Sequence, residues 1–313
     1  MKHWIAATAF ALAMPAAALA ADYTIMAPAA PGGGWDQTSR AMQEAMQSAG
    51  IGNAQVINVP GAGGTIGLAQ FVNEAAGDPT KLIVGGYVMV GAILTNASPV
   101  TLADVEPLAR LTGEYEVIVV PANSPIQDLA GLVAALKANP GAVSWAGGSA
   151  GGTDHITAGL LAKTVGVDPT AVNYIAYSGG GEALAALLGG QVTVGISGYS
   201  EFSSQIAAGE LRLLAVSSDV RIPGVDAPTL MEAGVDMALQ NWRMVAAAPG
   251  ITDEEKAAIN ADIEKLVTSA TWKQTLETKG WQDMYLAGAD FDTQLAADTE
   301  ATSAILKDIG LVQ

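Results

Sequence analysis

Two glycine-rich segments carry the clearest chemical signal in this sequence. Gly33 and Gly34 precede a predicted helix at 35–48, and Gly151 and Gly152 precede a predicted helix at 153–165. The first N–H groups of a helix have no partner within it, and the helix dipole adds positive charge there. Two such loops that face each other would hold a carboxylate at each end of a small molecule. The alternative is that these glycines only allow tight turns and close packing of helices on strands.

The side chains beside these glycines suggest how a ligand would be held. Ser149 and Thr153 are neutral hydroxyl donors for a carboxylate. Asp36 and Asp154 stand at helix starts, where a carboxylate stabilises the helix but repels an anion placed too close. We therefore interpret both mainly as capping residues that shape their loops, with direct ligand contact as the alternative. Trp35 either forms a wall of the pocket, with its indole N–H as a donor, or fills a gap between helices.

Two further residues have open interpretations. His155 follows the second glycine loop and is either a donor to an anion or a structural residue with its hydrogen bonds satisfied inside the fold. Arg243 is one of few cations in an acidic chain, and it either brings positive charge to the pocket or belongs to a surface ion pair.

Enzyme chemistry finds little support in the sequence. Residues 147–151 match the G-x-S-x-G nucleophile elbow, but this kind of hydrolase needs a histidine late in the chain. Beyond the first twenty residues the only histidine is His155, six residues after Ser149, so a serine hydrolase is the weaker alternative. The chain has no cysteine, no P-loop and no G-x-G-x-x-G motif. We expect no catalysis, no cofactor and no metal.

The glycine loops belong to a repeated unit of strand, loop and helix. Besides the two units described, a strand at 56–59 leads to a helix at 65–75, and a strand at 174–177 leads through Ser178 and Gly179 to a helix at 182–188. Strands that alternate with helices predict an α/β fold with largely parallel sheets. Two well-separated sets of units indicate two α/β lobes. Ligands of such sheets bind beyond the carboxyl ends of the strands, where these loops lie.

The composition sets outer limits on function. The 313 residues suffice for about two domains, and half of them are hydrophobic, which excludes a disordered chain. The 14 Lys and Arg against 31 Asp and Glu give a net charge of −17, which makes nucleic acid an unsuitable partner. In the C-terminal third, a capping box at 252–255 and a last helix at 291–308 indicate structural helices, with Trp272 and Trp281 expected in the core.

The first twenty residues indicate export. Lys2 gives a positive start, residues 5–13 are apolar, and Ala18 and Ala20 are small residues at the positions that signal peptidase reads. This pattern predicts a signal peptide at 1–20 that is cleaved after Ala20, and hence an exported protein; the resemblance given below implies the periplasm as its location. The alternative, a membrane anchor, requires an apolar segment of about 20 residues, and Pro15 interrupts this one.

Several of these segments together resemble the Bug/TctC family, the periplasmic receptors of tripartite tricarboxylate transporters. The matching segments are YTIMAP at 23–28, PGGGWD at 31–36, PGAGGTIG at 60–67, GGTDH at 151–155, YSGGGEAL at 177–184 and LGGQV at 188–192. The resemblance covers essentially the whole chain after residue 20. It implies a type II periplasmic binding protein, with two α/β lobes and a ligand cleft between them.

The resemblance also implies a ligand and a partner. A small carboxylate would bind between residues 32–36 and 149–155, partly through backbone amides, and a membrane permease of two components would receive it. Trp35 resembles the tricarboxylate branch, so citrate or a similar tricarboxylate is the leading ligand and a dicarboxylate or aromatic carboxylate the alternative; Met244 departs from the small residue expected there. We expect one lobe at 21–116 plus 243–313, a second at 117–242, and a monomer. A sensor that presents the ligand to a kinase would use the same pocket.

Overall fold

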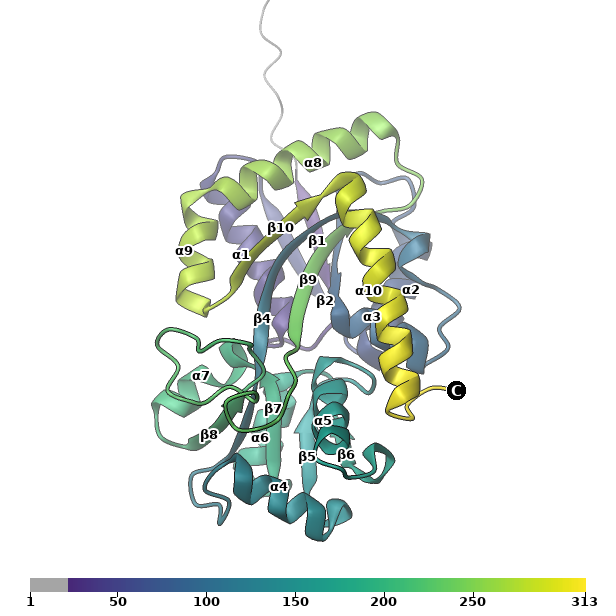
Figure 1. The fold of residues 1–313 in the computed structure, drawn as a ribbon. Coiled ribbons are helices and arrows are strands. Elements are labelled where there is room, and N and C mark those ends of the chain that lie inside the picture. The colour runs from purple at the N-terminus through teal and green to yellow at the C-terminus, as the bar shows by residue number, and fades with distance from the viewer. Residues whose placement is uncertain (1–21) are drawn as a thin grey trace, which may run out of the picture.

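One mixed β-sheet runs through the whole molecule. The computed structural model describes residues 22–313. Within them ten strands form a sheet in the order β2-β1-β3-β9-β4-β7-β5-β6, and β10 and β8 also pair with β4. Helices cover this sheet on its two faces (Figure 1). The strands are β1 (Tyr23–Ala27), β2 (Ala54–Asn58), β3 (Lys81–Gly86), β4 (Glu106–Pro121), β5 (Ser144–Gly147), β6 (Asn173–Ala176), β7 (Val194–Gly198), β8 (Leu211–Val216), β9 (Gln240–Ala247) and β10 (Gln282–Ala287).

The α-helices confirm the predicted repeat of strand, loop and helix. The four helices predicted after the glycine loops, and the strands predicted at 56–59 and 174–177, are found with both ends within two residues of their expected bounds. The helices are α1 (Gly34–Ser48), α2 (Thr65–Glu74), α3 (Tyr87–Thr95), α4 (Leu129–Ala138), α5 (Thr153–Thr164), α6 (Gly180–Leu188), α7 (Tyr199–Ala207), α8 (Asp253–Thr268), α9 (Ala270–Lys279) and α10 (Gly288–Asp308). A short 3-10 turn, η1 (Ala62–Gly64), precedes α2.

The first lobe is built on β1, β2, β3, β9, β10 and residues 106–115 of β4. Its strands β2, β1 and β3 are parallel, whereas β9 runs antiparallel to β3 and to β4. Helices α1, α2, α3, α8 and α10 pack on these strands, and α9 packs on α1. The predicted capping box begins α8, where the Thr252 hydroxyl accepts from the Glu255 amide and Glu255 bonds back to Thr252.

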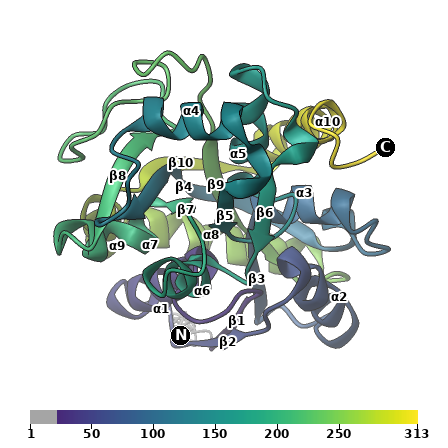
Figure 2. The same cartoon turned by 90° about the horizontal axis from the view of Figure 1, so that it is seen from below.

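The second lobe is built on β5, β6, β7, β8 and residues 116–121 of β4. Its strands β6, β5 and β7 are parallel, and β4 runs antiparallel to both β7 and β8. Figure 2 shows α4 and α5 on one face of these strands and α6 and α7 on the other. One hydrophobic cluster lies on each face, around Leu132 and Trp145 under α4 and α5 and around Leu187 and Phe202 under α6 and α7.

Strand β4 is continuous through both lobes. It pairs with β9 up to Tyr115 and with β7 from Glu116 onward, so its partner changes where one lobe ends and the other begins. The lobe boundaries expected from the sequence, after residues 116 and 242, therefore fall inside β4 and β9. Strand β4 crosses from the first lobe to the second, and the irregular segment before β9 makes the return crossing (Figure 1).

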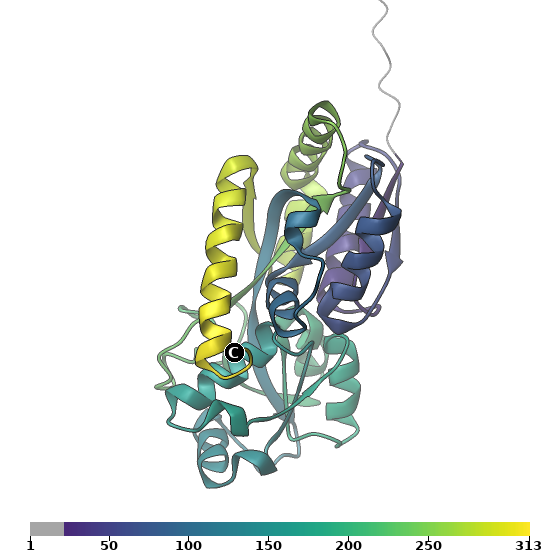
Figure 3. The ribbon, with the colours of Figure 1, turned by 90° about the vertical axis from the view of Figure 1, so that its right-hand side faces the viewer.

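The C-terminal segment completes the first lobe and reaches the second. Trp272 and Trp281 are buried in the first lobe's core, as expected. The end of α10 contacts α5, where Asp308 pairs with Lys163 and Ile309 lies against Gly159 (Figure 3). No helix among residues 22–313 has the length and apolar character needed to cross a membrane. The predicted signal peptide at 1–20 lies outside the described residues.

Candidate functional site

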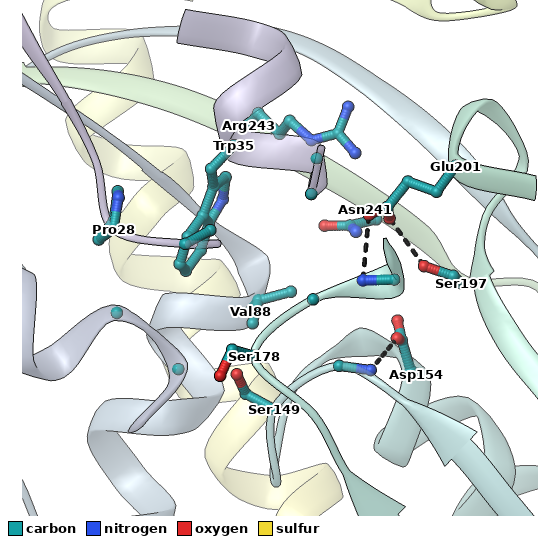
Figure 4. Close-up of a pocket in the computed structure, with 18 of the residues that line it drawn as sticks. Pro28, Trp35, Val88, Ser149, Asp154, Ser178, Ser197, Glu201, Asn241 and Arg243 are labelled. Carbon is teal, nitrogen blue, oxygen red and sulfur yellow. Dashed lines mark hydrogen bonds between the residues drawn. The ribbon is translucent and has the colours of Figure 1, made fainter. Parts of the chain in front are cut away.

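A small cavity lies between the lobes, at the loops that follow the parallel strands. Its volume is about 60 Å³. The first lobe contributes Pro28, Ala29, Gly33, Gly34, Trp35, Gly61, Gly63, Gly64, Val88, Asn241 and Arg243. The second lobe contributes Gly148, Ser149, Asp154, Ser178, Gly179, Gly180, Ser197 and Glu201. Figure 4 shows these side chains converging from both lobes.

The glycine loops of the two lobes touch each other across this cavity. A Cβ atom added to Gly179 would lie 3.5 Å from the Cα atom of Gly33, and one added to Gly63 would lie 3.2 Å from the Cβ atom of Ser149. A Cβ atom added to Gly91 of α3 would overlap the carbonyl oxygen of Gly151. The structure therefore shows the lobes closed on each other, with glycine at the points of closest approach.

The start of α1 lacks a side-chain cap, and Asp36 explains the shape of the loop before it. The Asp36 carboxylate accepts hydrogen bonds from the Gly32 amide at 2.8 Å and from Asn58 at 2.9 Å, and it pairs with Arg40 at 3.0 Å. Burial raises the pKa of Asp36, but the bonds from Arg40, Gly32 and Asn58 outweigh it and lower that pKa. Asp36 thus shapes the loop and stands outside the cavity wall.

The start of α5 is arranged differently. Gly152 is the N-cap residue of α5 and has no side chain that could accept a hydrogen bond from the helix. Thr153 is buried, and its hydroxyl has no hydrogen-bond partner in the described part of the chain. Asp154 lines the cavity and accepts from the Gly148 amide at 2.6 Å. Burial raises the pKa of Asp154 to about 6, although the Gly148 hydrogen bond lowers it.

His155 has a structural role in this geometry. Its Nδ1 atom accepts from the Gly151 amide at 3.2 Å, and its ring stacks on Tyr174 with 4.1 Å between centroids and 5° between planes. Burial lowers the pKa of His155 to about 4, so the imidazole is neutral at pH 7. Within residues 22–313 no hydrogen bond joins His155 to Ser149, so the structure does not assemble the serine–histidine pair of a hydrolase.

Arg243 is buried, so the surface ion pair considered for it is wrong. Its guanidinium pairs with Glu114 of β4, and both side chains are at most 2% exposed. The second carboxylate oxygen of Glu114 accepts from the amide and hydroxyl of Ser200, at 3.2 and 2.7 Å. The Trp281 ring lies 5.0 Å from the guanidinium carbon, and its indole N–H donates to Ser200. Arg243 therefore joins the cavity wall to the junction of the lobes.

The sequence analysis did not identify two acidic side chains of the site, Glu116 and Glu201. Burial, followed by the neighbouring carboxylates of Asp154 and Glu201, raises the pKa of Glu116 well above its usual range. Glu201 lines the cavity, and burial raises its pKa to about 7 although Ser197 and two backbone amides donate to it. Glu114 and Glu116 alternate along β4 and so face the same side. In the sequence, the signal that could have pointed to Glu116 is this pair of acids, Glu114 and Glu116, which stand two residues apart beside an apolar run.

The structure brings together eight of the thirteen predicted site residues on the cavity wall, namely Gly33, Gly34, Trp35, Ser149, Asp154, Ser178, Gly179 and Arg243. It places the other five beside the wall, in or next to the same loops, namely Asp36, Gly151, Gly152, Thr153 and His155. Trp35 is buried and packs against Gly64, so it serves both as a wall and as a filler of the gap between helices.

Two α/β lobes around a closed cleft define a solute-binding receptor of the type II periplasmic binding protein class. The family model described as "Tripartite tricarboxylate transporter family receptor" (TctC) matches residues 38–311. The chain therefore belongs to this receptor family, as its motifs indicate.

Individual proteins of known name are similar over most of their length. BugT of Bordetella pertussis is 29% identical over 264 residues, which make up 82% of this chain and 79% of that protein. The structure of the periplasmic binding protein BugD has a TM-score of 0.84 at 22% identity, covering 93% of this chain and 98% of that one. MatC from Rhodopseudomonas palustris, solved with bound malate, has a TM-score of 0.78 at 24% identity, covering 92% and 98%. Both structures share the fold.

Proposed function

We propose that this protein is a periplasmic receptor that binds a small carboxylate between its lobes and delivers it to a tripartite transporter permease. The observation that carries the proposal is the meeting of two lobes at uncapped helix starts around one cavity. Backbone N–H groups at a helix start favour an anion. Gly33, Gly34, Ser149, Ser178 and Gly179 would contact the ligand directly, whereas Asp36, Gly151, Gly152, Thr153 and His155 would hold the loops in place.

The size and charge of the cavity bear on which carboxylate binds. Citrate is the ligand that we expect from the resemblance of Trp35 and its neighbours to the tricarboxylate branch. A cavity of about 60 Å³ with Asp154 and Glu201 on its wall favours a smaller ligand with fewer negative charges. MatC, which shares the fold, holds malate. Citrate and smaller carboxylates are therefore compared directly in the experiment below.

The remaining parts of the proposal concern delivery. The signal peptide at 1–20 would take the chain to the periplasm, and cleavage after Ala20 would leave a monomer of two lobes, 21–116 plus 243–313 and 117–242. Closing the lobes brings together surfaces of both, and the permease would recognise that combined surface. Transport of the ligand in cells that lack this receptor should fall to background.

Thermal unfolding of residues 21–313 with a panel of carboxylates tests the binding step. A ligand at about 100 times its dissociation constant stabilises the folded state by about 2.7 kcal/mol. In a protein of this size that raises the melting temperature by about 5–10 °C. The panel contains citrate, malate, succinate, acetate and a set of amino acids, and it is repeated after refolding from denaturant, which removes a copurified ligand. No shift with any carboxylate or amino acid after refolding would contradict the receptor function.

A further inference from the structure

Helix α5 of the second lobe is apolar on two opposite sides. Ala158 and Leu161 belong to a hydrophobic cluster of the second lobe itself. Ile156 is a buried member of the cluster that forms the core of the first lobe, and Leu160 packs against that cluster. A helix that is apolar all round is buried all round. Helix α5 is therefore held between the two lobes, with one side in the core of each.

The end of α10 contacts the side of α5 that faces the first lobe (Figure 3). Residues three, four and seven apart share one face of a helix, and this face carries Ile156, Gly159, Leu160 and Lys163. Ile309, directly after α10, is 1% exposed, and its Cδ1 atom lies 3.0 Å from the position that a Cβ atom on Gly159 would take. Asp308 pairs with Lys163 at the edge of the contact. The absence of a side chain at Gly159 thus lets Ile309 approach the helix backbone closely.

Helix α5 also follows the glycine loop that closes on the first lobe. Gly151, just before the helix, lies against Gly91 of α3, and Lys163 in its last turn meets Asp308. Twelve residues at 1.5 Å each make α5 about 18 Å long, so the first lobe contacts both of its ends. The core of the second lobe holds the other side of α5, and the helix must move with that lobe. A rotation that separates the glycine loops therefore also draws α5 away from α10.

We propose that the end of α10 is a latch that stabilises the closed arrangement of the lobes. The latch consists of Ile309 and the face of α5 on which it packs. Both are buried when the lobes are closed, and opening returns their apolar surface to water. Ile309 is thus a positioning residue, which raises ligand affinity by increasing the share of closed molecules. This inference rests on the proposed receptor function and places a control of affinity outside the cleft.

The test separates ligand affinity from stability. Ile309→Ala should weaken binding at least about tenfold, because it removes an apolar contact that belongs to the closed state. Ile263→Ala is the matched control, since Ile263 of α8 is equally buried but packs within the core of the first lobe. Both variants should melt at a lower temperature than the wild type. Titration calorimetry of residues 21–313 with citrate, malate and succinate should show weaker binding in Ile309→Ala alone.

Two further variants identify which part of the contact matters. Asp308→Asn breaks the ion pair with Lys163, but these side chains are 52% and 45% exposed, so water and salt screen their attraction. Binding should therefore weaken less than about twofold. Ile309→Val removes a single carbon and keeps most of the packing, so it should fold even if Ile309→Ala does not. It should weaken binding about twofold to threefold.

The outcomes separate the latch from the receptor function. An unchanged affinity in a folded Ile309 variant, or an equal loss in Ile263→Ala, would overturn the latch and leave the receptor intact. Failure of all three probes to bind the refolded wild type would count against the receptor function alone. Small-angle scattering without ligand then decides on the latch, because the contact needs no ligand. Ile309→Ala should have a larger radius of gyration than the wild type and Ile263→Ala, and equal radii would overturn the latch.

Discussion

Arg243 of β9 and Glu114 of β4 form a buried ion pair at the point where the two lobes join. Glu114 also accepts two hydrogen bonds from Ser200 at the start of α7, so one carboxylate connects both lobes. Arg243 lines the cavity, and Glu201 follows Ser200 directly. The ion pair thereby links the position of the binding residues to the junction about which the lobes would move.

Removing one partner of this pair should strongly destabilise the protein. Glu114→Gln leaves the guanidinium buried without a counter-charge, which costs about 3–5 kcal/mol. The double variant Glu114→Gln with Arg243→Met removes both charges and should recover part of that loss. Urea unfolding followed by tryptophan fluorescence measures both free energies of unfolding.

An exposed ion pair provides the matched control. Arg221 and Glu232 pair at 2.9 Å, but their side chains are 57% and 45% exposed. Arg221→Gln should cost less than about 1 kcal/mol, because water and salt screen an exposed pair. If Glu114→Gln cost no more than Arg221→Gln, the buried pair would have no structural role.

The acids of the cavity should make the protein less stable as pH rises toward 8. Burial raises the pKa of Glu201 to about 7, against about 4.3 for glutamate in an unfolded chain. The folded state therefore holds a proton that the unfolded state releases. This contribution to stability is complete below about pH 4.3 and is lost as pH rises through about 7. Asp154, with a pKa of about 6, acts in the same direction.

Melting temperatures of the wild type and of Glu201→Gln between pH 6.5 and 8 isolate this effect, because His155 contributes equally to both proteins. In this range the melting temperature of the wild type should fall more steeply than that of Glu201→Gln. Glu116, Asp154 and Glu201 are the neighbouring acids and Arg243 the nearest cation in the cavity, so the difference between the two proteins reports on Glu201. Parallel curves would show that Glu201 does not titrate there.

His155 should affect stability without controlling binding by its charge. Its pKa of about 4 lies below the usual histidine value, so protonation of the unfolded chain destabilises the fold as pH falls from about 6.5 to 4. His155→Phe keeps the stacking on Tyr174, loses the hydrogen bond from Gly151, and should cost about 1 kcal/mol. Ligand affinity should show the same pH dependence between 6.5 and 8 in both proteins, as measured by titration calorimetry. A histidine NMR signal that titrates near pH 6.5 in the wild type would contradict this assignment.

Closure of the lobes should depend on Gly91. Alanine at this position would overlap the carbonyl of Gly151 in the other lobe, so Gly91→Ala should hold the lobes apart. We expect a larger radius of gyration with ligand present and at least about tenfold weaker binding, because the closed state is less populated. Small-angle scattering and titration calorimetry measure these quantities.

Gly131→Ala is the control for this prediction. Gly131 lies in α4, far from the cleft, and an added Cβ atom would lie 3.4 Å from Asp128 Oδ1, an ordinary contact. Its scattering profile and affinity should match those of the wild type. Full closure of Gly91→Ala with ligand would show that the contact between Gly91 and Gly151 does not limit the motion.

Local patterns predicted much of the fold and the loops of the site. A glycine run between an apolar strand and a helix is encoded within about twenty residues, so α1 and α5 and their loops were predicted closely. Asn241, Ser197 and Glu201 come from elements that only the folded sheet brings to the cavity. Glu116 was not singled out in the sequence, and the pairing of β4 with β7 places it where it is buried.

Strand β9 has a consequence for how the chain folds. It pairs with β3, where Leu82 lies opposite Ala247, and with β4, where Glu106 lies opposite the same residue. The first lobe therefore cannot finish its sheet until the whole second lobe has been made. Contacts between residues so distant in sequence slow folding. A protein with this topology stays incomplete until its C-terminal third emerges.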